Sequence, residues 1–495
     1  MRMPRRQVLQ VVAGAAAFPI ASRTARAEDQ TTPSSASTRP LADRLAAYAA
    51  NLRYEDLDEA TIESVKVHLI DAIGCGIAAF HDEPVRICRG VALANGGHGG
   101  ATVIGTTRQT SPDLAAFANG AAFRYLDLND AYVGRITGHP SDDIAACLAV
   151  AEAEHASAAE LITAIVLAYE INCRLIDAFD VSMSARGWDV PMLSLPAVAL
   201  ATGKLMKLPS NKLSQAVSLA LNDHISMGQT RAQGLSDWKG IADAEASRNA
   251  IFGATLARAG LTGPAPIFEG RWGFFNLVTG PAEVDTSRFG GRGVPFLIHQ
   301  CGLKSYAAHI TAQTTVPAAV VLAKDIGNLD RIVAIEIGTT RRGKQIAGSD
   351  ADKWAPETKE TADHSLPYIA ARAMLDGDIG NDSYTPDKLH DPRVLALMHK
   401  ITVNEDPDFA TLTVNVPPTR LTARLDNGQK VVRLVDSMPG FPGHPVSRAD
   451  VERKFRSNIG GPWPRLQTDA ILQSLWALDQ THDLSALLNK LALPA

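Results

Sequence analysis

The helical period of the apolar residues from about 41 to 298 is the feature that most constrains how this chain folds. Within this stretch, segments such as 58–80, 142–155 and 158–179 repeat apolar side chains about every three to four residues, and Gly, Pro and Ser separate them. Many positions on the apolar faces are Ala, Gly or Ser, which allow helices to approach closely. The pattern predicts a compact, all-helical domain.

The periodicity changes near Cys301. Three later segments alternate apolar and polar side chains with a period of two, which is typical of strands: residues 331–338, 409–416 and 421–435. Asn427-Gly428 lies inside the last of these segments and is a strong signal for a hairpin turn. Helical stretches at 312–324 and 365–375 are interspersed with these strands. We therefore expect a smaller α+β domain here.

These changes divide a chain that, at 495 residues, is too long for one hydrophobic core. Residues 28–40 are rich in Thr, Ser and Pro and predict a disordered linker. We expect a helical domain at residues 41–298, an α+β domain at 299–447, and helices at 448–495 that return to the helical domain. The predicted fold class is mainly α, with one large helical domain built from both ends of the chain and a smaller α+β domain inserted between them.

The first residues of the chain read as an export signal rather than as part of the fold. The pair Arg5-Arg6 precedes an apolar run at residues 11–20 and the sequence Ala25-Arg26-Ala27, which is typical of a cleavage site. This order predicts a twin-arginine signal peptide at residues 1–27 and a periplasmic location; the alternative is a frayed basic N-terminus. Because the apolar run is too short to span a bilayer, we expect no stable membrane anchor.

Charge and composition limit the partners. The formal net charge is −5 and the sequence has no basic run, so we expect no nucleic acid partner. A hydrophobic content of 46% with 20% charged residues is ordinary for a soluble globular protein. The five cysteines are scattered, without C-x-x-C spacing, and most lie in apolar helical segments, which predicts buried free thiols rather than disulfides or an iron–sulfur site.

Residues 124–142 are the stretch in which reactive side chains are most concentrated. Its polar residues and helix breakers follow one another closely: Asp127, Asn129, Asp130, Gly134, Gly138 and His139-Pro140-Ser141. The glycines and the proline predict a loop between helices, and loops on a rigid scaffold often carry functional groups. The alternative is a polar loop in which Ser141 caps the next helix.

Three other stretches are candidates for chemistry. Lys239 stands near the start of a helix rich in small residues, where a cation opposes the helix dipole unless an anion compensates; the alternative is a surface lysine. Lys304, Tyr306 and His309 lie at the border between the two predicted domains, where clefts form; the alternative is a hinge with a structural histidine. For His364-Ser-Leu-Pro-Tyr368, a capped helix start is the favoured interpretation.

Taken together, these stretches resemble the MmgE/PrpD family, which includes 2-methylcitrate dehydratases, cis-aconitate decarboxylases and some epimerases. The resemblance extends over residues 41–491. It is carried by motifs in a fixed order: Asp127-x-Asn-Asp, Gly138-His139-Pro140-Ser141-Asp142, Trp238-Lys239 with Asn249-Ala250, Leu261-Thr-Gly-Pro with Phe268-Glu-Gly, Leu303-Lys304-x-Tyr306 with His309, and His364-Ser-x-Pro-Tyr368.

The resemblance implies a helical domain with a smaller lid, paired as a homodimer, and an active site in the cleft that uses neither a metal nor another cofactor. The catalytic residues that it implies are Asp127, His139, Lys239, Lys304 and Tyr368. We expect four more residues to contact the substrate: Arg231, Arg135, Tyr306 and His309.

Such residues fit chemistry on a carbon acid. Removal of a proton next to a carboxylate builds up negative charge, which fixed cations stabilise as it develops. Lys239 and Lys304 would hold the carboxylates of a small di- or tricarboxylate substrate. His139, oriented by Asp127, is suited to proton transfer near neutral pH, and Tyr368 is a candidate donor to the leaving group. The leading prediction is a metal-independent lyase, specifically a hydro-lyase.

The sequence departs from the usual family pattern inside the predicted site. Ala131 stands where Thr is usual, Tyr132 where Trp is usual, and Val190 where dehydratase-like members often have His, while Arg135 adds a cation to the loop. These changes predict an altered pocket and put 2-methylcitrate itself in doubt as the substrate. Two alternatives follow: an epimerase or isomerase of a dicarboxylate on the same scaffold, or a non-catalytic carboxylate-binding protein.

Overall fold

The computed structural model describes residues 39–95, 100–180, 182–410 and 416–494. The predicted signal peptide lies outside these residues. Helices account for most of the described residues, which confirms the mainly α class. Among the helices of the described residues, none has both the length and the apolar character needed to cross a bilayer.

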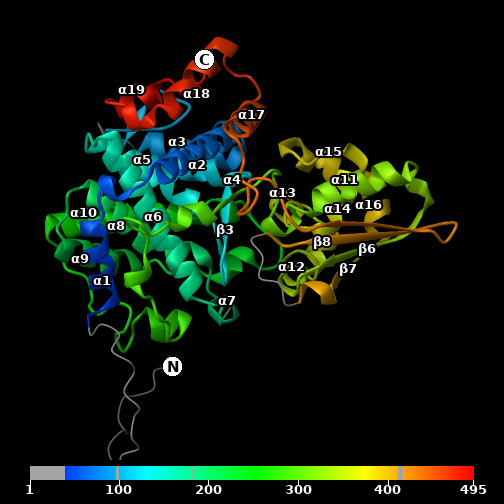
Figure 1. Cartoon of the computed structure of the whole chain (residues 1–495), viewed down its shortest axis with the longest axis horizontal. Coiled ribbons are helices and arrows are strands. Elements are labelled where there is room, and N and C mark those ends of the chain that lie inside the picture. The colour runs from blue at the N-terminus through cyan, green and yellow to red at the C-terminus, as the bar shows by residue number, and fades with distance from the viewer. Residues whose placement is uncertain (1–38, 96–99, 181, 411–415, 495) are drawn as a thin grey trace, which may run out of the picture. The chain divides into compact units, whose positions relative to one another are not determined.

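The part of the chain before the α+β region, up to about residue 298, is built mainly of helices (Figure 1). In chain order they are α1 (Leu41–Asn51), α2 (Glu59–Ala78), α3 (Glu83–Ala94), α4 (Pro112–Tyr125), α5 (Ile144–Ala153), α6 (Ala158–Ala178), α7 (Ser182–Ala185), α8 (Ser194–Leu205), α9 (Ser210–Asn222) and α10 (Ala242–Ala259).

Local sequence signals explain where these helices begin. The segments 58–80 and 158–179, expected to be helical from their period, are α2 and α6. Asp58 caps α2, because its side chain accepts a hydrogen bond of 2.8 Å from the amide of Thr61. Ser157 caps α6 in the same way, and the acidic side chain three residues later completes a capping box.

Small residues allow the helices to pack closely, as the sequence predicts. A Cβ atom at Gly120 of α4 would lie only 3.1 Å from the Cβ of Ala244 on α10. All five cysteines are buried and free, which confirms the expectation of buried thiols. The closest pair is Cys173 and Cys301, whose sulfur atoms lie 3.8 Å apart.

The helical region also contains short strands, so the expectation that it is entirely helical was wrong. These strands are β1 (Ala101–Thr102), β2 (Gln109–Thr110), β3 (Asp130–Val133) and β4 (Thr137–Gly138); a fifth short strand, β5 (Gly302–Leu303), follows just after this region. β1 pairs with β2, and β3 lies between β4 and β5. Segments of two to four residues are too short to show a period of two in the sequence, which is why no strand was expected there.

The α+β region, which follows, has one four-stranded sheet with helices packed on it. Its strands are β6 (Ile332–Thr339), β7 (Ile401–Glu405), β8 (Thr419–Leu425) and β9 (Lys430–Val435). The strand order is β7-β6-β8-β9, with β6 parallel to β7 and antiparallel to β8. The helices of this region are α11 (Thr315–Ile326), α12 (Arg341–Ala347), α13 (Lys359–Ala362), α14 (Leu366–Asp376), α15 (Pro386–Leu389) and α16 (Pro392–Met398).

The expected hairpin is present between β8 and β9, where Arg424 pairs with Lys430 and Gly428 adopts a positive φ of 81°. Of the strand expected at residues 409–416, residues 411–415 lie outside the described residues. Phe409 ends a short 3₁₀ turn instead of starting a strand.

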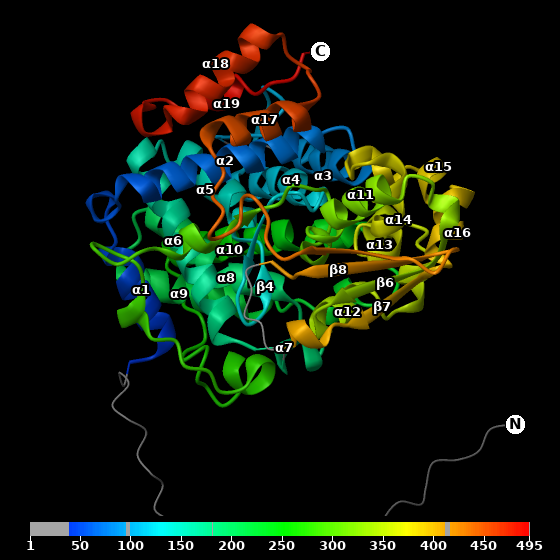
Figure 2. The ribbon, with the colours of Figure 1, turned by 45° about the vertical axis from the view of Figure 1, so that its right-hand side comes forward.

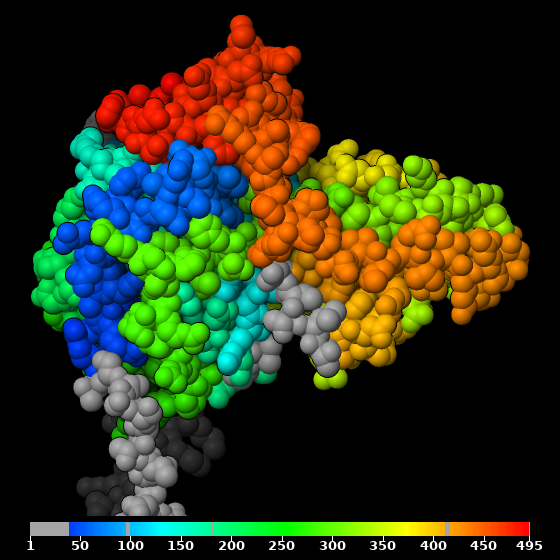
Figure 3. Space-filling view, in the orientation of Figure 1, coloured from blue at the N-terminus to red at the C-terminus, as the bar shows by residue number. Residues whose placement is uncertain are grey.

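The last helices are α17 (Arg448–Ile459), α18 (Arg465–Trp476) and α19 (Leu484–Asn489). α17 packs against α2, as two views of the ribbon show (Figures 1 and 2). In the space-filling view, the C-terminal residues in red lie directly on the blue surface of the N-terminal helices (Figure 3).

Two large apolar cores correspond to these regions. The first includes side chains of the N-terminal helices together with Phe455, Leu475 and Leu487 from the last helices. The second includes Ile335 and Leu421 of the sheet and side chains of α11 and α14. The second core also contains residues at the end of α4 and just after it, so it reaches the stretch that carries the candidate site.

Candidate active site

The loop between α4 and α5 is held in place by two strand pairings. Tyr132 of β3 pairs with Gly138 of β4, and Asp130 of β3 pairs with Leu303 of β5. A Cβ atom at Gly138 would lie 2.4 Å from the Cδ1 of Ile176, so glycine allows this hairpin to lie against α6. The pairing with β5 brings the residue after Leu303 next to the loop.

That residue is Lys304, and its ammonium group binds Asp127. Asp127 follows α4 with a positive φ of 52° and is completely buried. The Nζ of Lys304 donates to Oδ1 of Asp127 at 2.6 Å and to its carbonyl oxygen at 3.0 Å. The Nζ of Lys239 lies 3.1 Å from Oδ2, and the guanidinium of Arg124 also pairs with Oδ1.

Each charge in this group requires the others, because an unpaired buried charge is costly. Lys239 is 1% exposed and Lys304 is 0% exposed. Burial alone would raise the pKa of the Asp127 carboxyl. Arg124, Lys239 and Lys304 lower this pKa by more, and it lies well below its usual range. Asp127 is therefore a fixed carboxylate at neutral pH.

The two lysines respond to burial in the opposite direction. Desolvation lowers the pKa of Lys304, against the effect of Asp127. Desolvation lowers the pKa of Lys239 to about 7, although Asp127 and Asp363 both act to raise it. Lys239 therefore titrates in the physiological range, so it can exchange a proton as well as stabilise a negative charge on a bound group.

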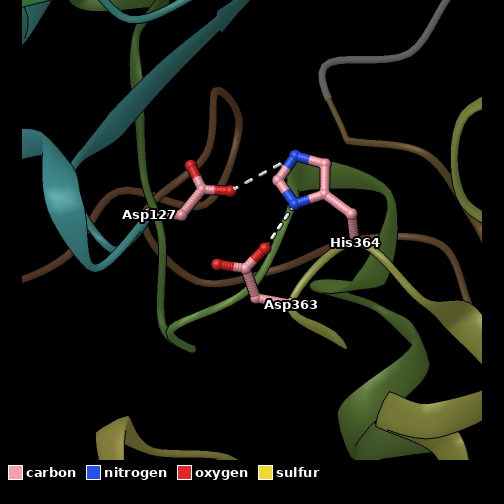
Figure 4. A group of neighbouring side chains, drawn as sticks. All are labelled: Asp127, Asp363 and His364. Atoms are coloured by element: carbon pink, nitrogen blue, oxygen red, sulfur yellow. Dashed lines mark hydrogen bonds and ion pairs between the residues drawn. The ribbon is translucent and has the colours of Figure 1, made fainter. Parts of the chain in front are cut away.

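Asp363 and His364 complete the group from the other side (Figure 4). The Nδ1 of His364 is bound to Oδ1 of Asp363, and its Nε2 lies 3.9 Å from Oδ2 of Asp127. Asp363 also lies 3.8 Å from the Nζ of Lys239 and 3.0 Å from the Nζ of Lys359. We call Arg124, Asp127, Lys239, Lys304, Asp363 and His364 the buried charge cluster.

His139 lies at the edge of this cluster and is only partly buried. Its Nδ1 lies 2.7 Å from the carbonyl oxygen of Asp130, which can only accept, so Nδ1 carries the proton and Nε2 is free of one in the neutral ring. Burial, followed by Arg124 and Lys304, lowers the pKa of His139 well below its usual value. The sequence suggested Asp127 as the group that orients His139; in the structure the orienting group is the carbonyl of Asp130.

The side chain of Asp130 anchors the loop. Its Oδ1 accepts hydrogen bonds from the amide and hydroxyl of Ser141, and its Oδ2 accepts one of 2.8 Å from the hydroxyl of Tyr169. The Nδ1 of His68 lies 3.0 Å from the same Oδ2. Ser141 lies within the 3₁₀ turn Pro140–Asp143 and its hydroxyl binds Asp130, so it stabilises the loop and does not cap the next helix, α5.

The surface interpretation of Lys239 was wrong. Lys239 belongs to a 3₁₀ turn, Asp237–Gly240, that precedes α10, and its side chain points into the buried charge cluster. The compensating anion that the sequence required is Asp127. His364-Ser-Leu-Pro-Tyr368 does begin a helix as expected, because the hydroxyl of Ser365 accepts a hydrogen bond of 3.1 Å from the amide of Tyr368.

Tyr368, which was expected to be catalytic, does not point its hydroxyl into the buried charge cluster. Its hydroxyl donates to the carbonyl of Ser383 at 2.6 Å, and its ring packs in the second apolar core beside Tyr384. Burial raises the pKa of Tyr368, and the charged groups that affect it are on α14 and farther along the chain, not in the cluster. The start of α14 lies at the cluster, but the Tyr368 side chain points away from the cluster.

The structure brings only some of the four expected substrate-binding residues near the buried charge cluster. The ring of His309 lies 4.5 Å from that of His364, between centroids, so His309 borders the cluster. Tyr306 is partly buried and packs against two apolar clusters. Arg231 binds both oxygens of Asp189 at 3.1 Å. Arg135 is exposed in the turn between β3 and β4, so the structure does not bring it to the cluster.

Arg231 nevertheless connects to the cluster through a carboxylate. Its NH2 lies 3.6 Å from Oδ2 of Asp243, and the same oxygen lies 3.8 Å from the Nε of Arg124. Asp142 lies 3.5 Å from that Nε as well. Burial raises the pKa of Asp142 well above its usual value and also raises that of Asp243. Arg124 therefore has three acidic side chains around it: Asp127, Asp142 and Asp243.

The geometry of three cluster residues resembles a metal site but their charges do not. Ligand atoms of Asp127, Asp363 and His364 lie within 4.8 Å of one another. However, Lys239 and Lys304 already neutralise Asp127, and Lys239 and Lys359 lie beside Asp363. A divalent cation would face these ammonium groups at close range, so the residues do not fit a metal.

Sequence reasoning missed Arg124, Asp363 and Lys359. Arg124 had a signal, because a charged residue three positions before Asp127 stands in an otherwise alanine-rich helix. Asp363 directly precedes the His364 motif. The local sequence of Lys359 does not distinguish it from a surface lysine, since its i,i+4 pairing with Asp363 is also common on exposed helices and its other partner, the carbonyl of Tyr125, is distant in the chain.

Comparisons with known proteins agree with this geometry. Residues 43–287 match the MmgE/PrpD N-terminal domain, and residues 306–478 match the MmgE/PrpD C-terminal domain. The chain belongs to the MmgE/PrpD family. The candidate site takes Asp127 and Lys239 from the first matched segment and His364 from the second, while Lys304 lies between the two.

Similar members of the MmgE/PrpD family match along most of their length. A 2-methylcitrate dehydratase from Cupriavidus necator is 29% identical over 454 residues, which cover 87% of this chain and 92% of the relative. One from Salmonella typhimurium is 27% identical, covering 85% and 90%. A mitochondrial 2-methylcitrate dehydratase from Yarrowia lipolytica is 26% identical, covering 88% and 87%. Together they support a dehydratase-type lyase.

These relatives contradict the predicted periplasmic location. They are named as 2-methylcitrate dehydratases, and the one from Yarrowia lipolytica is named as a mitochondrial enzyme, not an exported one. The paired arginines and the apolar run that led to the prediction lie within residues 1–38, outside the described residues.

Proposed function

We propose that this protein is a metal-independent hydro-lyase that acts on a small di- or tricarboxylate. The observation that carries the proposal is the position of Lys239 and Lys304, which bind the two oxygens of Asp127 in a buried site. Fixed cations in such a site stabilise the negative charge that develops when a proton is removed next to a carboxylate. The names of the relatives support elimination of water as the reaction.

His139 is our candidate for the group that removes the proton. It is neutral, because burial and nearby cations lower its pKa, and its Nε2 is the nitrogen free to accept a proton. The carbanion electron pair then expels the hydroxyl group from the neighbouring carbon, and water leaves after that oxygen gains a proton. Lys239 is a suitable donor for this proton, since its pKa is about 7.

The proposal of a metal-independent reaction rests on charge. Lys239, Lys304 and Arg124 supply positive charge where a metal-dependent lyase would place its ion. Dialysis of purified protein against a strong chelator should therefore leave turnover unchanged. Loss of activity that a divalent cation restores would contradict this part of the proposal.

Turnover of a panel of carboxylates, with 2-methylcitrate among them, tests the reaction. Formation of the alkene is followed by ultraviolet absorbance, and products are identified by mass spectrometry. His139→Ala and Lys239→Ala should each lower turnover by several orders of magnitude. The exposed residues His482 and Lys490 provide matched controls, and their alanine variants should retain full activity. Full activity of either site variant would refute the assignment.

Two other outcomes would identify the alternative functions. In deuterated water, exchange at a stereocentre without alkene formation would indicate an epimerase. A rise in melting temperature with a carboxylate that the protein does not turn over would indicate a binding protein.

The finer organisation of the chain is also a proposal. We infer a helical domain at residues 41–298 with helices from 448–495, and a lid at 299–447. The two apolar cores support this division. Limited proteolysis tests it, since cleavage should concentrate near residues 298 and 447.

We also propose that the protein forms a homodimer. The exposed apolar side chains of Ile87 and Val91 on α3 and of Phe252 on α10 support a contact with another protein chain. Light scattering after size-exclusion chromatography distinguishes a dimer from a monomer.

A further inference from the structure

Asp363 contacts four charged or titratable residues of the candidate site and its surroundings. It is completely buried, and one oxygen binds the Nδ1 of His364 while the other lies 3.0 Å from the Nζ of Lys359. Its carboxylate also lies 3.8 Å from the Nζ of Lys239. Its backbone carbonyl accepts a hydrogen bond of 2.9 Å from the amide of His309. One residue thus touches two histidines and two lysines.

The backbone around Asp363 is fixed on both sides. Its amide donates to the carbonyl of Lys359 at 2.8 Å, which closes the short helix α13. Two residues later, Ser365 caps α14 through the amide of Tyr368. The hydroxyl of Ser365 also donates to the carbonyl of Lys353. Because this connection cannot rotate freely, the direction of the Asp363 carboxylate is set by the fold.

The contact with Asp363 determines which nitrogen of His364 carries a proton. A carboxylate can only accept, so the neutral ring of His364 is protonated on Nδ1. The other nitrogen, Nε2, then carries a lone pair and lies 3.9 Å from Oδ2 of Asp127. Without a partner, a neutral histidine can adopt either tautomer, and the protonated Nε2 would then turn a donor toward the centre of the cluster.

We propose that Asp363 is a positioning residue of the active site: it holds His364 in the tautomer whose free Nε2 faces Asp127, and it keeps Lys239 beside Asp127 by attracting its ammonium group. Nothing in the proposed reaction itself requires Asp363 to touch the substrate. This inference rests on the proposed function for its effect on turnover, but the tautomer of His364 exists independently of any reaction.

Several charged groups face Lys239 and His364, and two carboxylates, those of Asp127 and Asp363, contact both. Asp127 and Arg124 face Lys239 from the end of α4, and Lys359 faces it from α13. Lys304 comes from the segment after β5, and the ring of His309 lies beside that of His364. Loss of the Asp363 charge leaves Lys239 with one carboxylate partner and several cations. The proton on Lys239 should then dissociate at a lower pH.

The first test needs no substrate. Protein labelled with ¹⁵N at histidine reports the protonated ring nitrogen from its chemical shifts, and the signals of His364 are assigned by their loss in His364→Gln. We expect protonation on Nδ1 in the wild-type protein and a shift of population toward Nε2 in Asp363→Ala. Protonation of wild-type His364 on Nε2 would overturn the proposal, even if Asp363→Ala does not fold.

The second test separates the charge of Asp363 from its shape. Asp363→Asn keeps an oxygen that accepts from His364 but removes the charge beside Lys239. We expect kcat to fall at least tenfold with little change in KM, and the alkaline limb of the pH profile to move down by about one pH unit.

Asp376→Asn is the control for this test. It removes another carboxylate that pairs with an arginine and a lysine, Arg372 and Lys388, and it should leave both properties unchanged. An unchanged pH profile in Asp363→Asn would overturn the role of Asp363, whereas absence of turnover in the wild-type protein would refute the proposed function alone.

Discussion

The ammonium group of Lys304 lies 2.6 Å from Oδ1 of Asp127 and 3.0 Å from its carbonyl oxygen, although 177 residues separate the two in the chain. Both side chains are fully buried. The contact follows from the pairing of β3 with β5, which aligns Asp130 with Leu303. A short strand pairing therefore brings together the carboxylate of one motif and the cation of another.

Removal of the Asp127 charge should strongly destabilise the protein. Asp127→Asn leaves Arg124, Lys239 and Lys304 facing an amide, and loss of one member of a buried ion pair costs about 3–5 kcal/mol. Urea unfolding followed by circular dichroism measures the change. The exposed Asp382 is the control, and Asp382→Asn should change the unfolding free energy by less than about 0.5 kcal/mol. Equal stability of the two variants would mean that the buried charges are not coupled.

The titration of Lys239 should limit activity at alkaline pH. Its pKa is about 7 in the free protein because burial disfavours the ammonium form. If the cation binds the substrate, kcat/KM falls as the pH rises above about 7. The cation of Lys239→Arg does not titrate in this range, so this variant should keep its lower activity constant to a higher pH. A wild-type profile that instead rises through pH 7 would show that Lys239 acts as a neutral base.

His364 should make the folded protein less stable in mild acid. Burial and Lys239 lower its pKa to about 3, whereas a histidine in the unfolded chain has a pKa of about 6.5. Below pH 6.5 the unfolded state binds a proton that the folded state does not, so stability from this group is complete above pH 6.5 and is lost as the pH falls toward 3. Between pH 7 and 5 the loss is roughly 1–2 kcal/mol.

The difference between wild-type protein and His364→Gln isolates this contribution from that of the buried carboxylates. Unfolding free energies of both proteins at pH 7 and pH 5 give the comparison. The variant should lose less stability over this interval. The exposed His482 is the control, and His482→Gln should behave as the wild type. Parallel curves for all three proteins would contradict the expected shift of the His364 pKa.

The long elements of the fold could be predicted because their signals are local. The helical period and the cap at Asp58 predicted α2, and Asn427-Gly428 predicted the hairpin of β8 and β9. The short strands β3 and β5 had no such signal, since each is held by a partner distant in sequence. Yet these strands are what bring Lys304 to Asp127, so the chemistry of the site depends on the part of the fold that is least visible in the sequence.

The site could be predicted only in part, for a related reason. The motifs identified Asp127, Lys239 and Lys304, and the structure brings these three together. Periodicity does not report the direction of a side chain at the first turn of a helix. It therefore did not reveal that Tyr368 turns into the second core while Asp363, five residues earlier, faces the cluster.

Tyr368 gives the most direct test of this difference between motif and geometry. Its hydroxyl donates to the carbonyl of Ser383 at 2.6 Å, inside the second apolar core and not toward the cluster. Tyr368→Phe removes this hydrogen bond and leaves a buried carbonyl without its donor, which costs about 1–3 kcal/mol. Turnover should stay within about threefold of wild type at temperatures where the variant is folded, because no group of the proposed reaction is altered.

The matched variant Tyr384→Phe loses a hydrogen bond of 2.6 Å to the carbonyl of Ala307 in the same core, and it should show the same pattern. A loss of turnover of several orders of magnitude in Tyr368→Phe alone, with the fold intact, would restore the catalytic role that the motif implied and would require α14 to move during the reaction.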